Sequence, residues 1–120
     1  MRQAGTRLET PEQLLQRFEW YVKARLYEEL PTTRVVQALG TTSYLLHQAV
    51  KHHYGGTAAA YIQRARLQEA AKLVRYTDFS MVEISQLLRF GGASYFAQRF
   101  REDHGIRPSA YREQYQCSVH

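Results

Sequence analysis

The sequence contains a single cysteine and no apolar run long enough to cross a membrane. Cys117 has no second cysteine with which to form an internal disulfide, and this favours a reducing compartment. A membrane-spanning helix needs about 18 consecutive apolar residues, and the first residues, MRQAGTRLETPEQ, lack the hydrophobic stretch of a secretory signal. We therefore predict a cytoplasmic protein that does not bind membranes.

Motifs for catalysis and for cofactors are also missing. The sequence has no nucleophile elbow, no phosphate-binding P-loop and no metal-binding motif. His47, His52 and His53 are spaced by five residues and by one, whereas a separation of four places two ligands on one helix face. We predict that the protein is not an enzyme and that it needs neither a metal nor another cofactor.

Acidic side chains are scarce in the later part of the chain. Residues 1–30 carry five basic and five acidic side chains, whereas residues 31–120 carry eleven basic and six acidic ones. The whole net charge of +5 therefore belongs to residues 31–120. A localised positive field attracts polyanions such as nucleic acids, although a basic protein without such a role would show the same charges.

No segment alternates apolar and polar residues as strands do, and the pattern is helical throughout. Prolines at first helical positions, hydroxyl side chains before helices and glycines after them mark the boundaries. Thr10 with Gln13 and Ser80 with Glu83 have the spacing of capping boxes at two helix starts. The predicted helices cover about 11–29, 33–39, 43–54, 57–76, 81–89, 93–104 and 108–114. The fold class is therefore all-α with about seven helices.

A repeat with an offset of 50 residues gives the strongest evidence for the architecture. The matching pairs are Leu46/Phe96, Gln48/Gln98, Val50/Phe100, Lys51/Arg101, Gly55/Gly105, Ala60/Ala110 and Tyr61/Tyr111. Each copy has a short helix, a tight turn, a second helix and a glycine, which is typical of a helix-turn-helix unit. Two unrelated helical hairpins are the alternative interpretation.

The helix over 57–76 joins the two copies and carries two apolar stripes that face nearly opposite directions. This pattern predicts two lobes, 12–56 and 77–115, docked on a linker helix, with tails over 1–11 and 116–120. The linker is about 28 Å long at 1.5 Å per residue, close to the roughly 34 Å of one duplex turn. Two reading helices in adjacent major grooves would fit this length.

The second helix of each copy has a polar face opposite its apolar one. These faces consist of Tyr44, His47, Gln48 and Lys51 in the first copy and Ser94, Ala97, Gln98 and Arg101 in the second. Glutamine can pair with adenine through two hydrogen bonds, whereas Lys51 and Arg101 lie further along, where phosphate is the expected partner. Hydroxyl groups at a helix N-terminus also suit phosphate; here they are Thr41, Thr42 and Ser43. Simple exposure to solvent is the alternative for each side chain.

The sequence also contains large aromatic residues and a group of cations on the predicted linker helix. The aromatic residues predicted to lie in the core are Phe18, Trp20, Phe96 and Phe100. The cations of the linker helix are Arg64, Arg66, Lys72 and Arg75. For these cations the sequence leaves two possibilities open, contact with phosphate and simple solvation.

The stretch SMVEISQLLRFGGASYFAQRFREDHGIRPSAYR (80–112) resembles the signature of the AraC/XylS family of bacterial transcription regulators. The similarity extends over roughly 12–115. The resemblance implies a two-lobe domain that binds double-stranded DNA of the nucleoid, mostly as an activator that contacts RNA polymerase. The chain is similar either to the small single-domain members or to the DNA-binding half of a longer one. Because one chain supplies two reading helices, we expect it to bind DNA as a monomer.

The resemblance also assigns roles to individual residues. It implies base contacts at Tyr44, His47 and Gln48, and at Ala93, Ser94, Ala97 and Gln98. Phosphate contacts in the second unit are expected at Arg99 and Arg101. Arg89 replaces the glycine that is usual in the second turn, and the second reading face is small and nearly uncharged. The alternative function is a protein-interaction module that binds RNA polymerase or another regulator and has weak DNA specificity.

Overall fold

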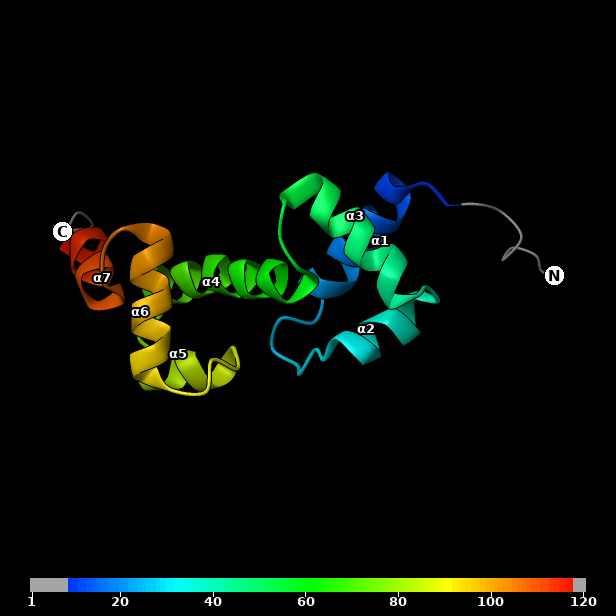
Figure 1. Cartoon of the computed structure of the whole chain (residues 1–120). Coiled ribbons are helices and arrows are strands. Elements are labelled where there is room, and N and C mark those ends of the chain that lie inside the picture. Colours follow the sequence, from blue (N-terminus) through cyan, green and yellow to red (C-terminus); the bar gives the residue numbers. More distant parts are fainter. Residues whose placement is uncertain (1–8, 118–120) are drawn as a thin grey trace. The chain divides into compact units, whose positions relative to one another are not determined.

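Seven helices and no strand are found over residues 9–117, the range that this computed structural model describes (Figure 1). In chain order they are α1 (Pro11–Lys23), α2 (Thr32–Leu39), α3 (Ser43–Tyr54), α4 (Ala58–Tyr76), α5 (Met81–Leu87), α6 (Ala93–His104) and α7 (Pro108–Cys117). The all-α prediction is confirmed. Residues 1–8 and 118–120, most of the two predicted tails, lie outside the described range.

The chain divides into two units. Within the described range, unit 1 comprises residues 9–25 together with Leu30–Tyr61, and unit 2 comprises Leu26–Glu29 together with residues 62–117. Unit 1 contains the pair α2 and α3, and unit 2 contains the pair α5 and α6. The boundaries of the predicted lobes and linker stay a prediction.

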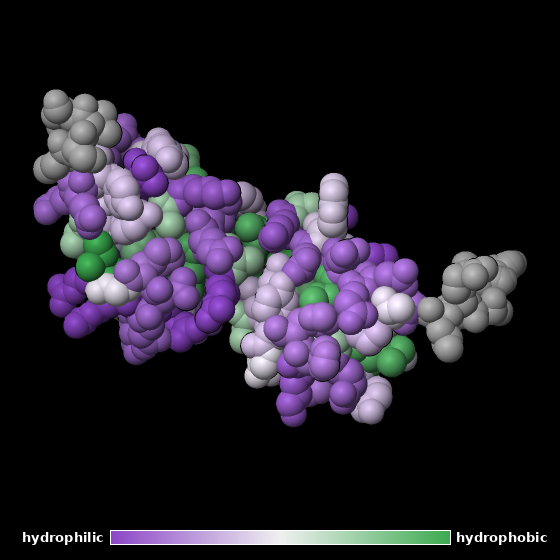
Figure 2. Space-filling view, turned by 90° about the horizontal axis from the view of Figure 1, so that it is seen from above, coloured by the Kyte–Doolittle hydropathy of each residue, from purple (hydrophilic) through white to green (hydrophobic). Residues whose placement is uncertain are grey.

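Unit 1 buries one face of each of its first three helices. Phe18 and Val22 of α1 are fully buried, as are Leu46 and Val50 of α3. Helices α1 and α3 pack against each other, and α2 packs against both. Hydrophilic side chains cover most of the face of the protein that Figure 2 shows. The apolar periodicity of the sequence therefore gives a core with a polar exterior.

Trp20 lies outside this core, because 80% of its surface is exposed. It follows Phe18 by two residues, which is about 200° around a helix, and so it points away from the buried face. The prediction that placed Trp20 in the core was wrong. The same prediction is confirmed for Phe18, Phe96 and Phe100, none of which is exposed.

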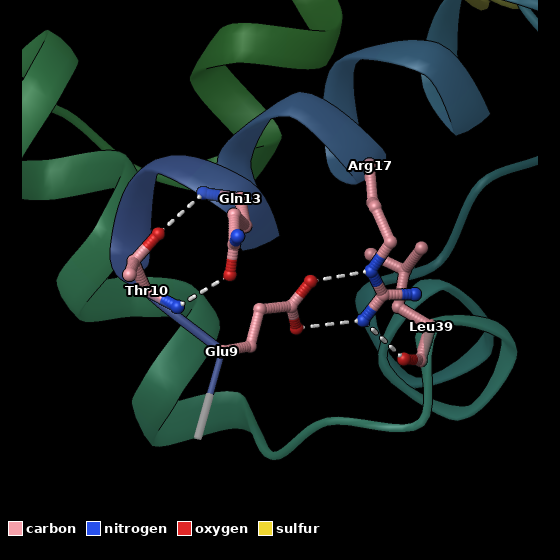
Figure 3. Close-up of polar contacts among 5 residues, drawn as sticks. All are labelled: Glu9, Thr10, Gln13, Arg17 and Leu39. Carbon is pink, nitrogen blue, oxygen red and sulfur yellow. Dashed lines mark hydrogen bonds and ion pairs between the residues drawn. The ribbon is translucent and has the colours of Figure 1, made fainter. Parts of the chain in front are cut away.

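The start of α1 carries two sets of polar contacts (Figure 3). Thr10 and Gln13 form the predicted capping box, in which the Gln13 amide donates to Thr10 Oγ1 at 3.1 Å and the Thr10 amide donates to Gln13 Oε1 at 3.0 Å. Arg17 donates to both carboxylate oxygens of Glu9, at 2.6 and 2.9 Å, and to the Leu39 carbonyl oxygen at 2.9 Å. The hydrogen bond from Arg17 holds the pKa of Glu9 below its ordinary value. Arg17 thereby holds the last residue of α2 against α1.

Helix α1 ends at Lys23, whereas the sequence pattern predicted an end at about Glu29. Beyond this point Leu26 is buried. The carbonyl groups of residues 26–28 accept hydrogen bonds from side chains instead of from helical amides. Arg66 donates to the carbonyl oxygen of Leu26 at 3.0 Å and to that of Glu28. Burial lowers the pKa of the Arg66 guanidinium. Arginine side chains therefore satisfy backbone groups that a longer helix would have paired internally.

Arg89 lies in the turn between α5 and α6 and has a left-handed backbone, with φ of 65°. Gly40, in the turn between α2 and α3, has φ of 64°. An ordinary side chain in this conformation costs roughly 1–2 kcal/mol. The Arg89 guanidinium donates to the Tyr27 carbonyl oxygen at 3.2 Å and lies 3.6 Å from the Glu29 carboxylate. These contacts offset part of the strain.

Two substitutions at position 89 separate the strain from the contacts. Arg89→Ala should lower the free energy of unfolding by about 1–2 kcal/mol, because it loses the hydrogen bond and the ion pair, while the backbone strain of the wild-type protein remains. Arg89→Gly loses the same contacts but relieves the strain, so it should be about 1 kcal/mol more stable than Arg89→Ala. Urea unfolding followed by circular dichroism measures both values. Equal stability of the two variants would contradict a left-handed residue 89.

Unit 2 has an aromatic core. Phe96 and Phe100 of α6 are fully buried. The ring of Phe90 lies 5.1 Å from that of Phe96, and the ring of Tyr111 lies 5.3 Å from that of Phe100. Arg112 donates through Nε to the Val74 carbonyl oxygen at 2.8 Å. The core of unit 2 thus fixes the inner face of α6 and leaves its opposite face to solvent.

Both apolar stripes predicted for the linker helix are largely buried in α4. Its buried side chains are Ala58, Ile62, Ala65, Leu67, Ala70, Ala71 and Val74. Tyr61 is half-buried, and its ring lies 5.1 Å from that of Phe18 and 4.9 Å from that of Tyr54. The two stripes therefore account for the core contacts of α4.

Candidate nucleic-acid interface

Helix α3 presents a continuous polar face to solvent. The residues predicted for this face are all exposed: Tyr44, His47, Gln48 and Lys51. Leu46 and Val50, which alternate with them along the helix, are fully buried. The buried pair fixes the rotation of the helix about its axis, so the structure brings the four predicted residues together on the outer side.

The hydroxyl residues before α3 have different local roles. Thr42 is the N-cap, and its Oγ1 accepts from the Leu45 amide at 3.1 Å. Ser43 is exposed at the first helical position, and Thr41 is half-buried. The lone pair that Thr42 uses for capping leaves its O–H free to donate, which is the group that a phosphate oxygen accepts from. The Thr42 hydroxyl can therefore cap α3 and still donate one hydrogen bond.

Helix α6 presents the corresponding face in unit 2. Ser94, Gln98 and Arg101 are exposed, whereas Ala93 and Ala97 are half-buried. The N-cap of α6 is Gly92, which has no side chain to accept from the first amides. The two small alanines make this face flatter than that of α3, and Arg101 supplies its positive charge.

Two of the predicted contact residues of α6 already have a partner within the helix. Glu102 accepts from Gln98 Nε2 at 3.3 Å and from Arg99 Nη1 at 2.7 Å. Arg99 is half-buried, and its predicted contact with phosphate stays a prediction. Sequence reasoning missed Glu102, although its position four residues after Gln98 is the spacing at which helical side chains meet.

A hollow of about 780 Å³ lies beside α6 in unit 2. Its lining includes four of the predicted residues, Ser94, Ala97, Gln98 and Arg101. Arg107, which was not predicted, also lines it and is exposed. Arg107 lies three residues after the end of α6 and directly before Pro108, where α7 begins. This short separation in the sequence could have indicated that Arg107 stays close to α6. Two arginines, Arg101 and Arg107, and the acidic Glu102 therefore line the hollow.

The four cations of α4 all have partners within the protein. Arg66 binds the carbonyl groups described above, and the Arg75 guanidinium lies 4.1 Å from the centre of the Tyr115 ring. Arg64 lies 3.8 Å from Asp103, and Lys72 lies 3.9 Å from Glu69. Arg64 and Lys72 remain largely exposed. The sequence left open contact with phosphate or simple solvation for these cations. Arg66 does neither, because it binds backbone carbonyl groups within the protein.

Comparison with known proteins identifies the family. The helix-turn-helix domain family model matches residues 35–114. AarP, a transcriptional activator of Providencia stuartii, is 30% identical over 92 residues, which cover 77% of this chain and 68% of AarP. The chain belongs to the AraC-type helix-turn-helix family of DNA-binding domains. The resemblance noted in the sequence is confirmed, and this family is not an enzyme family.

Solved structures agree with the fold of this AraC-type domain. A transcriptional regulator of the AraC type from Chromobacterium violaceum is 24% identical, with a TM-score of 0.83 and coverage of 94% of this chain and 96% of that one. The DNA-binding domain of AdpA, solved in complex with a target DNA, is 19% identical with a TM-score of 0.76, covering 88% and 94%. These likenesses confirm the seven-helix fold.

Other curated relatives are longer. PocR of Salmonella typhimurium is 29% identical over 100 residues, which are 83% of this chain and 33% of PocR. RhaS of Enterobacter is 28% identical over 106 residues, which are 88% of this chain and 38% of RhaS. The chain therefore spans about a third of the length of these relatives, and what it shares with them is the DNA-binding domain of a transcription regulator.

Among the side chains of residues 9–116, no three from His, Cys, Asp or Glu are grouped so that they could hold a metal ion. Among the helices in that same range, none combines the length and the apolar character of a membrane span.

Proposed function

We propose that this AraC-type domain is a sequence-specific transcription regulator that inserts α3 and α6 into adjacent major grooves of double-stranded DNA. One observation carries the proposal. Both helices follow a tight turn, bury one face and expose a polar face with a glutamine at the same register, Gln48 in α3 and Gln98 in α6. A helix held in this way can enter the major groove and read base edges.

The proposed roles follow the positions on each helix. Base readout is assigned to Tyr44, His47 and Gln48 in α3, and to Ala93, Ser94, Ala97 and Gln98 in α6. Phosphate contact is assigned to Thr41, Thr42, Ser43, Lys51, Arg99 and Arg101. The 19 residues of α4 give a helix about 28 Å long, which supports binding in two successive grooves by a monomer.

The names of the relatives support activation of transcription over repression. RhaS and AarP are transcriptional activators by name, so we assign activation, with RNA polymerase as the protein partner, to this domain as well. An activator of this type acts on the nucleoid, and we therefore place it in the cytoplasm.

Selection of bound duplexes from a random pool tests the proposal directly. We expect a preferred asymmetric sequence that is bound at least about 1000-fold more tightly than random DNA. Binding should weaken steeply with salt, because each phosphate contact releases counterions. A pool that shows no enrichment, with binding only at very low salt, would contradict the proposal.

A protein-interaction module is the second candidate function. The observation that favours it is the paired state of Gln98 and Arg99, both of which contact Glu102 rather than projecting freely. Under this alternative α6 binds RNA polymerase or another regulator and only α3 contacts DNA. The length of the selected sequence distinguishes the two functions. A module of this kind would prefer bases in one major-groove segment, whereas a protein that reads with both helices would prefer bases in two.

A further inference from the structure

Glu102 stands at the edge of the polar face of α6 and bonds to two of its residues. One carboxylate oxygen accepts from Gln98 Nε2 at 3.3 Å, and the other accepts from Arg99 Nη1 at 2.7 Å. The Glu102 side chain is 50% exposed and that of Arg99 is 37% exposed. A single acidic group therefore contacts both a proposed base-reading residue and a proposed phosphate-binding residue.

The contact determines which way the Gln98 amide points. A carboxylate can only accept hydrogen bonds, so the NH₂ group of Gln98 must face Glu102. The carbonyl oxygen and the second N–H of the amide then remain available. Adenine is recognised through this combination, in which the amide oxygen accepts from N6 and the amide N–H donates to N7.

Arg99 stabilises this arrangement from the other side. Its ion pair restrains the carboxylate, and the same pair neutralises a charge that would otherwise attract the DNA backbone. Charged groups that are paired within the protein add less to the salt-dependent attraction for phosphate. The arrangement thus lowers general affinity for DNA and restricts the conformations of Gln98.

We propose that Glu102 is a positioning residue that sets the base preference of α6 by holding Gln98 in the orientation that pairs with adenine. This inference rests on the proposed function of α6 as a reading helix. The first copy of the repeat has Gln48 in the place of Gln98, but His52 stands where the second copy has Glu102. The device is therefore specific to the second unit.

The test compares the preference among four duplexes that differ at one base pair of the selected site. Gln98→Ala should identify that base pair by reducing the preference for A·T about tenfold. Glu102→Ala should reduce the same preference by about three- to tenfold, because the amide is no longer held. Glu102→Gln offers Gln98 a donor as well as an acceptor, so the Gln98 amide can turn either end toward position 102 and the preference should fall between that of Glu102→Ala and that of the wild-type protein. The double variant Gln98→Ala with Glu102→Ala should lose no more of the preference for A·T than Gln98→Ala alone, because Glu102 acts through Gln98.

The measured quantity is a ratio of affinities, which cancels the uniform gain expected when a negative charge is removed. Glu113→Ala, at an exposed acid on α7, controls for this gain and should leave the ratio unchanged. Circular dichroism verifies that each variant remains helical. An unchanged ratio for Glu102→Ala, or a base pair other than A·T at the Gln98 position, would overturn the inference while the proposed function stands. A wild-type protein without any preferred sequence would overturn both.

Discussion

Replacement of Phe18 by alanine should lower the free energy of unfolding by about 3–5 kcal/mol. The Phe18 side chain is fully buried, and its ring lies 5.1 Å from that of Tyr61. Removing the ring loses its transfer free energy and leaves a cavity that the surrounding helices fill only in part. A loss of this size is a large fraction of the stability of an ordinary domain.

Trp20→Ala is the matched control, because Trp20 lies on the same helix and is 80% exposed. This variant should change the free energy of unfolding by no more than about 0.5 kcal/mol. Circular dichroism must follow both unfolding transitions, since Trp20 is the only tryptophan in the sequence. Equal losses for the two variants would show that the rotation of α1 described here is wrong.

Gln48→Ala should weaken binding to the selected site by about 1–3 kcal/mol and relax the preference at one base pair. Gln48 is exposed in the first turns of α3, where the residues of a reading helix reach base edges. The loss comes from two hydrogen bonds to one base, so it should appear on the cognate duplex and be absent on random DNA. Competition gel shifts with both duplexes measure this difference.

Two further variants serve as comparisons for Gln48→Ala. Lys51→Ala should weaken binding to all sequences alike and reduce the salt slope by about 1, as expected for a phosphate contact. Gln16→Ala removes an exposed glutamine from α1 and should leave binding unchanged. If Gln48→Ala weakens cognate and random DNA equally, Gln48 does not read bases.

Local signals in the sequence were enough to predict most helices. Thr10 with Gln13 and Ser80 with Glu83 form the two capping boxes that the sequence predicts, with bonds of 2.8 to 3.1 Å. Capping boxes depend on residues three apart, so a single sequence contains all the information they need. The polar faces of α3 and α6 were predicted for the same reason, because their buried partners recur with the helical period.

Contacts between distant residues could not be predicted in this way. The carbonyl groups of Leu26 and Tyr27 bind Arg66 and Arg89, which are 40 and 62 residues away. No local sequence pattern indicates such pairs. The predicted end of α1, at about Glu29, was therefore too far along the chain, because the carbonyl groups after Lys23 bind these distant arginines. Trp20 was misplaced because its aromatic character was given more weight than its position on the helix. Contact with DNA stays a prediction for every residue of the two polar faces.

The way in which Arg66 and Arg89 bind residues 26–28 also determines which positions are free to diverge. Their guanidinium groups contact carbonyl oxygens of the main chain, and every amino acid supplies such an oxygen. Substitutions at Glu28 therefore leave the hydrogen bond to its carbonyl in place, whereas few side chains can replace a planar donor that spans two acceptors. During evolution, the recipients of these bonds are expected to vary and the donors to persist.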